Sequence, residues 1–385
     1  MKPFVFNTAA SIQLGAGKIA ELGEMVRARM GKRVMLISDP GLVDLGMVGA
    51  AVEILEKADL EVVVYADVQA DPPEAIIHAA VEMARSAKVE GIIGLGGGSS
   101  LDVAKLVAVL ALGQETLTGM YGVGNVKGPR LPLILVPTTS GTGSEVTMVS
   151  IVTTGKSEKM GVVSPVILPD VALLDPELTY GLPPHITAAT GIDAMVHAIE
   201  AYASASPNNN AISRNLACEA LRLMGGAIER AVHDGGDTGA RADMLLGSMM
   251  AGQAFANSPV AAVHALAYPI GGHYKVPHGL SNALVLPHVL RFNAVTAPRP
   301  YAELAPHVFP EMAGMGTQEA ASAFAEGMQE LSKRCGLQQG LREMGIERDA
   351  LPMLARDAMN QTRLLVNNPR EVDLDAALAI YEAAY

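Results

Sequence analysis

Short apolar segments alternate with amphipathic ones in the first half of the chain. Residues 33–38, 60–66 and 91–96 are rich in Val, Ile and Leu, which predicts buried strands. Residues 74–87 and 100–111 place apolar side chains near a helical period, which predicts helices between or after those strands. This alternation is typical of a parallel sheet covered by helices on both faces. Further strand-like segments follow at residues 131–137, 146–154, 159–164 and 171–175.

The pattern changes near Pro183. Beyond it Ala, Met and Leu dominate, the β-branched runs disappear, and residues 186–204 predict a long helix after a Pro-Pro start signal. The remainder of the chain is predicted to be helical. We therefore expect an α/β domain with a mainly parallel sheet over residues 1–181 and an all-helical domain over residues 182–385. A cleft between two such domains is a common place for a small-molecule site.

Composition and charge exclude several classes of partner. The chain of 385 residues is 50% hydrophobic, but its apolar runs fall short of the roughly 18 residues that cross a bilayer. No signal peptide is recognisable, and a net charge of −12 without a basic stripe argues against nucleic acid. Cys218 and Cys335 cannot form a disulfide framework. We expect a cytoplasmic protein whose apolar surplus fills a large interior or a subunit interface.

A glycine-rich loop, GLGGGSSLDVAK at residues 94–105, connects a predicted strand to a predicted helix. Gly96, Gly97 and Gly98 have no Cβ to keep a phosphate from the backbone, and Ser99 is expected to cap the helix. The free N–H groups and the positive end of the helix dipole favour an anion there. The loop matches neither GxGxxG nor a P-loop, and a tight turn that needs positive φ explains its glycines equally well.

Two further features lie at the ends of predicted strands. Asp39 follows residues 33–38, where an acid can bind the ribose hydroxyls of NAD and repel a 2′-phosphate, or simply cap a helix after an Asp-Pro-Gly turn. The polar segment PTTSGTGSEVT, residues 137–147, is either a second ligand-binding loop or a hydrogen-bonded turn. Because ligands bind at the carboxyl ends of strands in open α/β sheets, the three features together favour a dinucleotide.

Asp193 and His197 are four residues apart on the long predicted helix, so their side chains project from one face. They lie beside an apolar stripe that should pack inward. A charged Asp at the edge of a core needs a partner, and either a divalent cation or a plain hydrogen bond to His197 supplies one. The stripe consists of Ile186, Ile192, Val196 and Ile199.

Residues 262–279 contain three of the nine histidines of the chain. His264 is expected to face inward from a short Ala-rich helix, and His278 follows Pro277 at the start of another helix. With Asp193 and His197 they form a set of three nitrogens and one oxygen, which suits Fe(II) or Zn(II) and leaves room for a substrate oxygen. His273 follows the Gly271-Gly272 pair, which resembles a turn, so it is expected to face solvent or a substrate cleft.

Four stretches together resemble the signatures of the iron-containing (group III) alcohol dehydrogenases: GGGSSLDVAK, PTTSGTGSE, ATGIDAMVHAIEAY and HALAYPIGGHYKVPHG. The resemblance implies a dinucleotide-binding α/β domain, an all-helical metal-binding domain and a site in the cleft between them. It implies NAD-linked reversible hydride transfer between a small primary alcohol and its aldehyde, with the metal as Lewis acid on the substrate oxygen. Fe(II) is the expected metal and Zn(II) the alternative, and a homodimer or larger homo-oligomer is expected.

The resemblance also assigns residues. It implies that the metal ligands are Asp193, His197, His264 and His278. Tyr268 stands where many members have His near the nicotinamide, and with His273 and His278 it completes the candidate catalytic residues. The implied cofactor-binding residues are Asp39, Gly96, Gly97, Gly98, Ser99, Ser100, Thr138, Thr139, Thr142, Thr147 and Lys159.

Other functions stay open within the resemblance. A hydroxy acid, a diol or maleylacetate could replace the simple alcohol, and Lys275 is the candidate partner for a substrate carboxylate. The dehydroquinate-synthase branch is disfavoured, because the helical half has no cluster of Lys and Arg around its histidines. A non-catalytic protein that binds NAD and metal is the remaining alternative.

Overall fold

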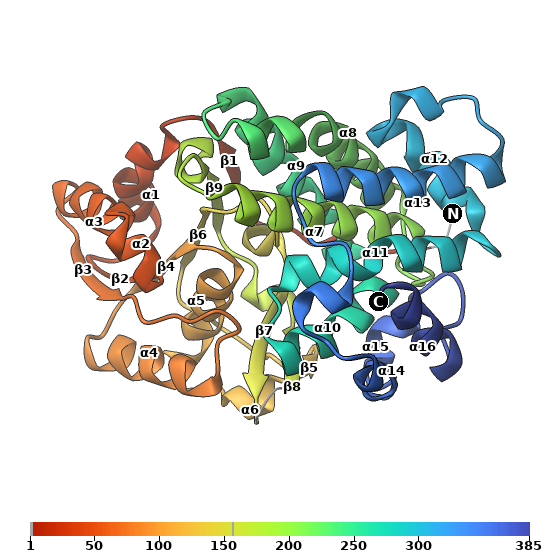
Figure 1. The fold of residues 1–385 in the computed structure, drawn as a ribbon. Coiled ribbons are helices and arrows are strands. Elements are labelled where there is room, and N and C mark those ends of the chain that lie inside the picture. Colours follow the sequence, from red (N-terminus) through yellow and green to blue (C-terminus); the bar gives the residue numbers. More distant parts are fainter. Residues whose placement is uncertain (1–2, 156–157) are drawn as a thin grey trace. The chain divides into compact units, whose positions relative to one another are not determined.

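The computed structural model describes residues 3–155 and 158–385. The chain forms two compact units (Figure 1). The α/β unit consists of residues 7–139 and 143–180, and the helical unit consists of residues 181–385 with residues 140–142 and 3–6. The predicted fold class, an N-terminal α/β domain with a parallel sheet and a C-terminal helical domain, is confirmed.

The main sheet of the α/β unit has six strands, all paired in parallel, in the order β1-β9-β6-β4-β2-β3. The apolar runs of the four inner strands lack the alternation of a half-exposed strand because both faces of the sheet are buried there, whereas the two edge strands are partly exposed. The strands are β1 (Ile12–Leu14), β2 (Arg33–Ile37), β3 (Glu61–Tyr65), β4 (Gly91–Gly96), β6 (Leu133–Pro137) and β9 (Val171–Leu174).

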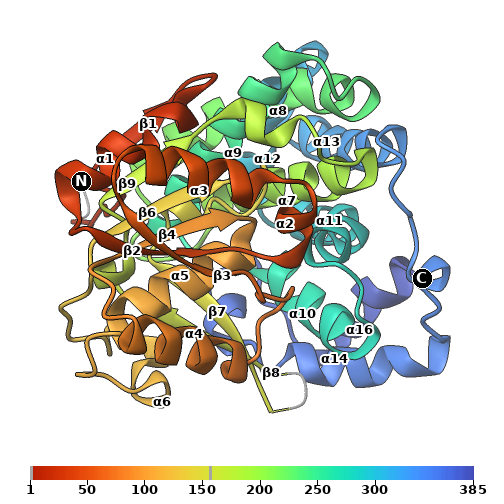
Figure 2. The ribbon, with the colours of Figure 1, turned by 90° about the vertical axis from the view of Figure 1, so that its left-hand side faces the viewer.

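Successive side chains of β2 show how the sheet is covered. Val34 and Leu36 belong to one apolar cluster with helices α1 and α3, and Met35 and Ile37 belong to another with α4 and α5. The two helix pairs therefore cover opposite faces of the sheet (Figure 2), as the period of two along a strand requires. The helices are α1 (Leu22–Arg29), α3 (Met47–Lys57), α4 (Glu74–Ser86) and α5 (Gly98–Leu110).

A second, smaller sheet follows the order β5-β8-β7. Strands β7 (Val149–Thr154) and β8 (Glu158–Val163) pair antiparallel, and β5 (Gly122–Val123) adds a parallel edge. The strands predicted over residues 146–154 and 159–164 thus exist, but they lie outside the main sheet. The short helices of the unit are η1 (Lys18–Glu21), α2 (Pro40–Asp44), α6 (Leu117–Met120), η2 (Ser144–Val146), η3 (Pro165–Ile167) and η4 (Pro176–Thr179).

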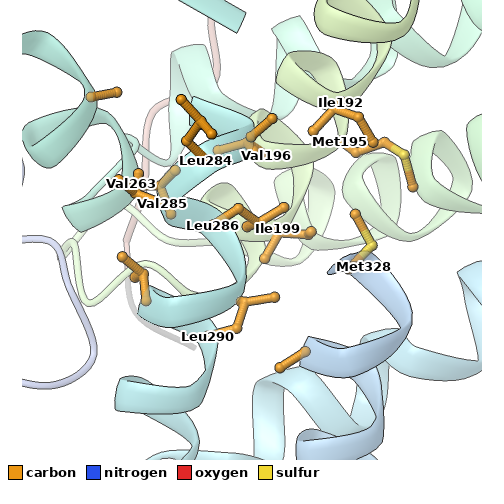
Figure 3. Packing of buried hydrophobic residues seen from close by; sticks show 14 of the residues in the cluster. Ile192, Met195, Val196, Ile199, Val263, Leu284, Val285, Leu286, Leu290 and Met328 are labelled. Atoms are coloured by element: carbon orange, nitrogen blue, oxygen red, sulfur yellow. The ribbon is translucent and has the colours of Figure 1, made fainter. Parts of the chain in front are cut away.

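The helical unit packs around α7 (Pro184–Ala203), whose residues from Gly191 onward are buried. Figure 3 shows Val196 and Ile199 of this helix next to Leu284 and Leu286 in the same apolar cluster. The other helices are α8 (Ala211–His233), α9 (Thr238–Asn257), α10 (Ala262–Tyr274), α11 (His278–Ala294), α12 (Pro298–Val308), η5 (Pro310–Met312), α13 (Thr317–Arg334), η6 (Leu341–Met344), η7 (Arg348–Ala350), α14 (Leu351–Ala358), α15 (Thr362–Leu365) and α16 (Leu374–Ala383).

Two local expectations in this unit are wrong. Ile186 is 37% exposed, because it lies in the first turn of α7 before the buried part of the helix begins. Gly271 and Gly272 do not form a turn, since α10 continues through them to Tyr274 and ends on Lys275 in a left-handed conformation. Within residues 3–155 and 158–385, no helix is long and apolar enough to cross a membrane.

A buried ammonium group ties the α/β unit together below its polar loops. The Lys105 side chain on α5 is inaccessible to solvent, and its Nζ donates to Ser144 Oγ (2.6 Å), Thr147 Oγ1 (3.2 Å) and the Val149 carbonyl (2.8 Å). An ion pair with Asp102 (3.3 Å) adds compensating charge. These contacts fasten η2 and the start of β7 to α5, since a buried ammonium is stable only with its donors satisfied.

Glu145 lies in the same buried region. Its Oε1 has no hydrogen-bond partner among the residues that the structure describes. Burial raises the pKa of the Glu145 carboxyl to about 7, although its own backbone N–H and the Lys105 ammonium act in the opposite direction. The folded protein therefore favours the protonated carboxyl up to neutral pH.

This burial predicts a pH-dependent stability that Glu145→Gln removes. The raised folded pKa favours folding at low pH, and this contribution disappears as pH rises from the unfolded value of 4.5 through the folded value of about 7. We expect the wild type to lose up to about 3 kcal/mol relative to the variant between about pH 5 and about pH 8 in urea unfolding. Parallel pH profiles for the two proteins would contradict the expectation.

Candidate metal and cofactor sites

The predicted cofactor-binding loops lie side by side at one edge of the main sheet. Strands β2, β4 and β6 are neighbours, and Asp39, the glycine loop and Thr138 directly follow them in that order. The Thr138 N–H donates to the Gly96 carbonyl (3.0 Å), which joins the two loops. Asp39, the glycine loop and Thr138, which are far apart in the sequence, therefore lie together at one edge of the sheet.

Gly96 has a backbone conformation that only glycine adopts easily, with φ of +148°. A Cβ there would lie 2.8 Å from the Ser100 side chain and 3.3 Å from Asp39 Oδ2. Gly97 is the N-cap residue of α5 and has no side chain, so the first N–H groups of the helix are left for a ligand. The expectation that Ser99 caps this helix is wrong, because α5 begins at Gly98 and Ser99 lies in its first turn.

Asp39 has the capping role considered for it and also contacts the glycine loop. Its Oδ1 accepts from the Leu42 N–H (3.2 Å) and caps α2, and its Oδ2 accepts from Ser100 Oγ (3.4 Å). The carboxylate therefore stands beside the glycine loop while one oxygen is used for capping.

The remaining polar residues of this group are distributed more widely. Thr139 lies next to Gly97, whereas Thr147 is buried against Lys105. Thr142 belongs to the helical unit. Lys159, on β8, pairs with Asp71 (2.6 Å) after β3 and donates to Thr153 Oγ1 (2.9 Å).

The four predicted metal ligands converge within the helical unit. One donor atom from each of Asp193, His197, His264 and His278 lies within 4.8 Å of the others. Helix α7 supplies the first two, α10 the third and the first residue of α11 the fourth. Asp193 Oδ1 is 3.9 Å from His264 Nε2 and 3.7 Å from His278 Nε2.

The electrostatics of the cluster favour an ionised Asp193 and a neutral His197. Burial raises the pKa of the Asp193 carboxyl, but the three neighbouring histidines and the Asn282 amide outweigh it and hold this pKa below its ordinary value. Burial, opposed by Asp193, lowers the pKa of His197 to about 3. Neutral imidazoles and an ionised carboxylate are the forms that bind a metal ion.

These donors fit one divalent cation. Oxygen and nitrogen ligands lie about 2.0–2.2 Å from such an ion, so donors on opposite sides of it are separated by about 4 Å. The observed mutual separations, all within 4.8 Å, match a single ion at the centre. Three ligands are buried, but 39% of the His278 side chain is accessible, so the set is open on the His278 side.

Four residues that sequence analysis did not single out support these ligands. The Gly141 carbonyl lies 3.3 Å from His197 Nδ1, and the Phe255 ring stacks on His197 with centroids 4.3 Å apart. Asn282 donates to Asp193 Oδ1 (2.6 Å), and Glu200 contacts His264 Nδ1 (2.6 Å). Asn282 follows His278 by four residues and Glu200 follows His197 by three, which was the available signal.

The candidate catalytic residues beyond the ligands separate into two places. Tyr268 is half-buried, and its ring centroid is 5.9 Å from that of His278. Burial raises the pKa of the Tyr268 hydroxyl, while a hydrogen-bonding Arg363 side chain on α15 acts against this. His273 instead pairs with Asp357 (2.6 Å) at the surface.

Helix geometry explains why His273 is separated from the ligands. Nine residues on one helix are about two and a half turns, so His273 and His264 lie on opposite faces of α10 and about 14 Å apart along it. Lys275 ends the same helix, and its Nζ donates to the Gly272 carbonyl (3.1 Å).

Comparison with known proteins decides the family. The model described as "Iron-containing alcohol dehydrogenase" matches residues 9–176, and "Fe-containing alcohol dehydrogenase family, C-terminal" matches residues 187–385. The chain belongs to the iron-containing alcohol dehydrogenase family. This confirms the resemblance inferred from the four motifs and the class of the enzyme, an NAD-dependent oxidoreductase.

Relatives and solved structures match along the whole chain. Long-chain-alcohol dehydrogenase 1 of Geobacillus thermodenitrificans is 40% identical over 97% of this chain and 94% of its own length. The structure of a 1,3-propanediol oxidoreductase superposes with a TM-score of 0.96 at 32% identity, covering 100% of both chains. Sulfoacetaldehyde reductase of Bifidobacterium kashiwanohense, in complex with NAD+, gives a TM-score of 0.88 at 29% identity, covering 100% of this chain and 99% of its own.

One glycine controls how closely α11 approaches α7. A Cβ on Gly279 would lie 2.3 Å from the Ala189 carbonyl oxygen and 3.2 Å from the Asp193 Cβ. Backbone cannot yield as a flexible side chain does, so any larger residue must displace the start of α11, which carries His278 and Asn282.

We therefore expect Gly279→Ala to weaken metal binding without unfolding the protein. Displacing one ligand and one supporting amide should lower metal affinity by about 10- to 100-fold, measured by chelator competition. Gly226→Ala is the matched control, because an added Cβ at this exposed helical glycine meets nothing within 4 Å. Equal metal affinity in the two variants would contradict the proposed role of the close approach.

Proposed function

We propose that the protein catalyses reversible hydride transfer between a small primary alcohol and NAD, with Fe(II) bound by Asp193, His197, His264 and His278. The convergence of these four donors, all within 4.8 Å of one another, carries the proposal. Family membership favours iron. Zn(II) suits the same donors and is the alternative metal.

The cofactors supply the reactive chemistry, and the chain positions them. A bound divalent cation would act as Lewis acid for the substrate oxygen and NAD would accept the hydride. The buried ligands hold the ion from one side, and the accessible His278 marks the side from which a substrate would approach. Phe255, stacked on His197, excludes water from the buried side.

The α/β unit supports NAD rather than NADP. The free N–H groups at the start of α5, together with Gly96 to Ser100, suit the pyrophosphate. The Asp39 carboxylate beside them suits the ribose hydroxyls and would repel a 2′-phosphate. Thr138 and Thr139 are proposed to line the same edge of the sheet. The placement of the combined site in a cleft between the domains stays a prediction.

Tyr268 is proposed as the hydroxyl of a proton relay. It is the candidate next to the accessible ligand His278. The contacts of His273 with Asp357 favour a surface ion pair instead. The homodimer or larger assembly and the cytoplasmic location stay predictions.

Metal dependence is the first test. We expect one metal ion per chain, loss of NAD-linked alcohol oxidation on chelation and recovery on adding Fe(II) or Zn(II). His264→Ala and His278→Ala should each lower metal affinity by more than about 100-fold. Substitution of a residue that only supports a ligand lowers metal affinity by up to about 100-fold, and loss of the ligand itself should cost more. His185→Ala, at an exposed position of α7, is the matched control and should change neither quantity.

Two outcomes would overturn the proposal. Oxidation that survives complete metal removal would show that the cluster is not the catalytic centre. Absence of turnover on a broad panel of alcohols and aldehydes, despite bound metal and NAD, would favour the non-catalytic alternative.

A hydroxy-acid substrate is the second candidate, and Arg363 is the observation that favours it. This exposed side chain hydrogen-bonds Tyr268, which neighbours His278. The next residue, Leu364, is buried with Ala265 of α10, which fixes the short helix α15 on this side. A guanidinium in this place matches a substrate carboxylate or sulfonate better than Lys275 does.

Charge-selective kinetics separate the two candidates. If the substrate is acidic, Arg363→Gln should lower kcat/KM for a carboxylate-bearing aldehyde by about 10- to 100-fold, the loss of one charged hydrogen bond of about 1.5–3 kcal/mol. A neutral aldehyde of the same length should be unaffected. Arg356→Gln, at an exposed position of α14, removes the same charge as a control. Equal effects on both aldehydes would exclude the acidic substrate.

A further inference from the structure

Glu200 is a third polar member of the face of α7 that carries the metal ligands. Asp193, His197 and Glu200 are spaced four and three residues apart, so they form one stripe along the helix. Glu200 is only 5% exposed. The function proposed above gives it no role, yet a buried carboxylate at this position must be compensated.

Both carboxylate oxygens of Glu200 are used by one short segment of α10. Oε1 accepts from the Val263 N–H (2.7 Å), and Oε2 lies 2.6 Å from His264 Nδ1. Ala261, the N-cap residue of α10, has no polar side chain, so Glu200 takes over the capping of this helix from α7. A carboxylate at a helix N-terminus is also favoured by the helix dipole.

The contact with His264 decides which ring nitrogen carries the proton. A carboxylate only accepts hydrogen bonds, so at 2.6 Å a hydrogen lies on Nδ1. Nε2 faces the Asn282 amide nitrogen at 3.4 Å, which can only donate, so this contact favours a lone pair on Nε2. Nε2 is the atom that faces the cluster, 3.9 Å from Asp193 Oδ1. The ring is thereby held in the form and direction that a metal ion needs.

His197 provides an internal comparison. The His197 Nδ1 faces the neutral Gly141 carbonyl at 3.3 Å. This contact is longer than the one between His264 Nδ1 and Glu200, and its acceptor carries no charge. Hydrogen bonds to an ionised acceptor are roughly twice as strong as neutral ones. Glu200 lies on the Nδ1 side of the His264 ring, whereas Asp193 lies near its Nε2.

We propose that Glu200 is a positioning residue of the metal site: it fixes the proton of His264 on Nδ1 and aims Nε2 at the ion, while it caps α10. The proposal rests on the proposed function for the identity of the site. It assigns Glu200 no contact with substrate or cofactor.

A double-mutant cycle tests the proposal. Glu200→Gln keeps the shape but cannot accept from both donors, so Co(II) and Zn(II) affinity in chelator competition should fall by about 10- to 100-fold. In a His264→Ala background the same substitution should change affinity by less than about twofold, because its target ring is gone. Glu303→Gln, which removes a carboxylate that binds Tyr202 on the same unit, is the matched control and should leave affinity unchanged.

Several results of this cycle would overturn the proposal. An unchanged affinity in Glu200→Gln would do so. An equal loss in both backgrounds would show a general structural role, as would a loss in the Glu303→Gln control. The d–d absorption of the Co(II)-loaded protein should also shift in Glu200→Gln, and a spectrum identical to that of the wild type argues against altered ligand geometry.

A measurement on the unmodified chain covers the case in which Glu200→Gln does not fold. Ring nitrogen-15 shifts of metal-free wild-type protein, with His264 assigned by its loss in His264→Ala, should show the proton on Nδ1. A proton on Nε2 would refute the proposal. This readout needs no metal, so it stands even if the wild type binds none, an outcome that would refute the proposed function alone.

Discussion

The buried carboxylate of Asp193 is the constraint on which the helical unit depends. Its side chain lies in the interior of a helix whose neighbouring positions are apolar core, and an uncompensated charge there would be prohibitive. Compensation comes from three imidazoles and one amide supplied by three helices. That requirement fixes how α10 and α11 pack on α7, down to the glycine that permits the close approach of α11. The same contacts therefore compensate the Asp193 charge and hold the helices of this unit together.

The α/β unit meets a related constraint in a different way. Its buried charge is the Lys105 ammonium, which is satisfied by hydroxyls, a carbonyl and Asp102 rather than by a ligand. Those contacts hold the second polar loop against α5, and α5 presents its N-terminus at the edge of the sheet. A fixed edge with unused N–H groups is pre-organised for an anion, which lowers the entropy that binding must overcome.

The sequence predicted those features that depend on residues of a single strand or helix. The apolar runs predicted the strands of the main sheet, and the four-residue spacing of Asp193 and His197 predicted that their side chains share one helix face, because both features depend on periodicity along one element. His264 and His278 joined that pair as a candidate set through their residue type and their concentration in residues 262–279, and the resemblance then implied the same four residues. Glu200 and Asn282 were missed because their partners are on other helices, and spacing alone cannot show which helices meet. The Gly271-Gly272 pair misled because packing overrode its weak helix propensity.

The asymmetry of the ligand set explains how one metal-binding frame can serve different substrates. The buried ligands and their supports, Glu200 and Asn282, lie in the packed core, where substitution would disturb several helices at once. The neighbours of the accessible ligand, Tyr268 and Arg363, belong to half-buried or exposed positions that can change without repacking. We infer that reactivity is conferred by α7 and its contacts, whereas substrate choice is set around His278. The solved structures fit this division, since they share the fold at TM-scores of 0.96 and 0.88 although their names record a propanediol and sulfoacetaldehyde.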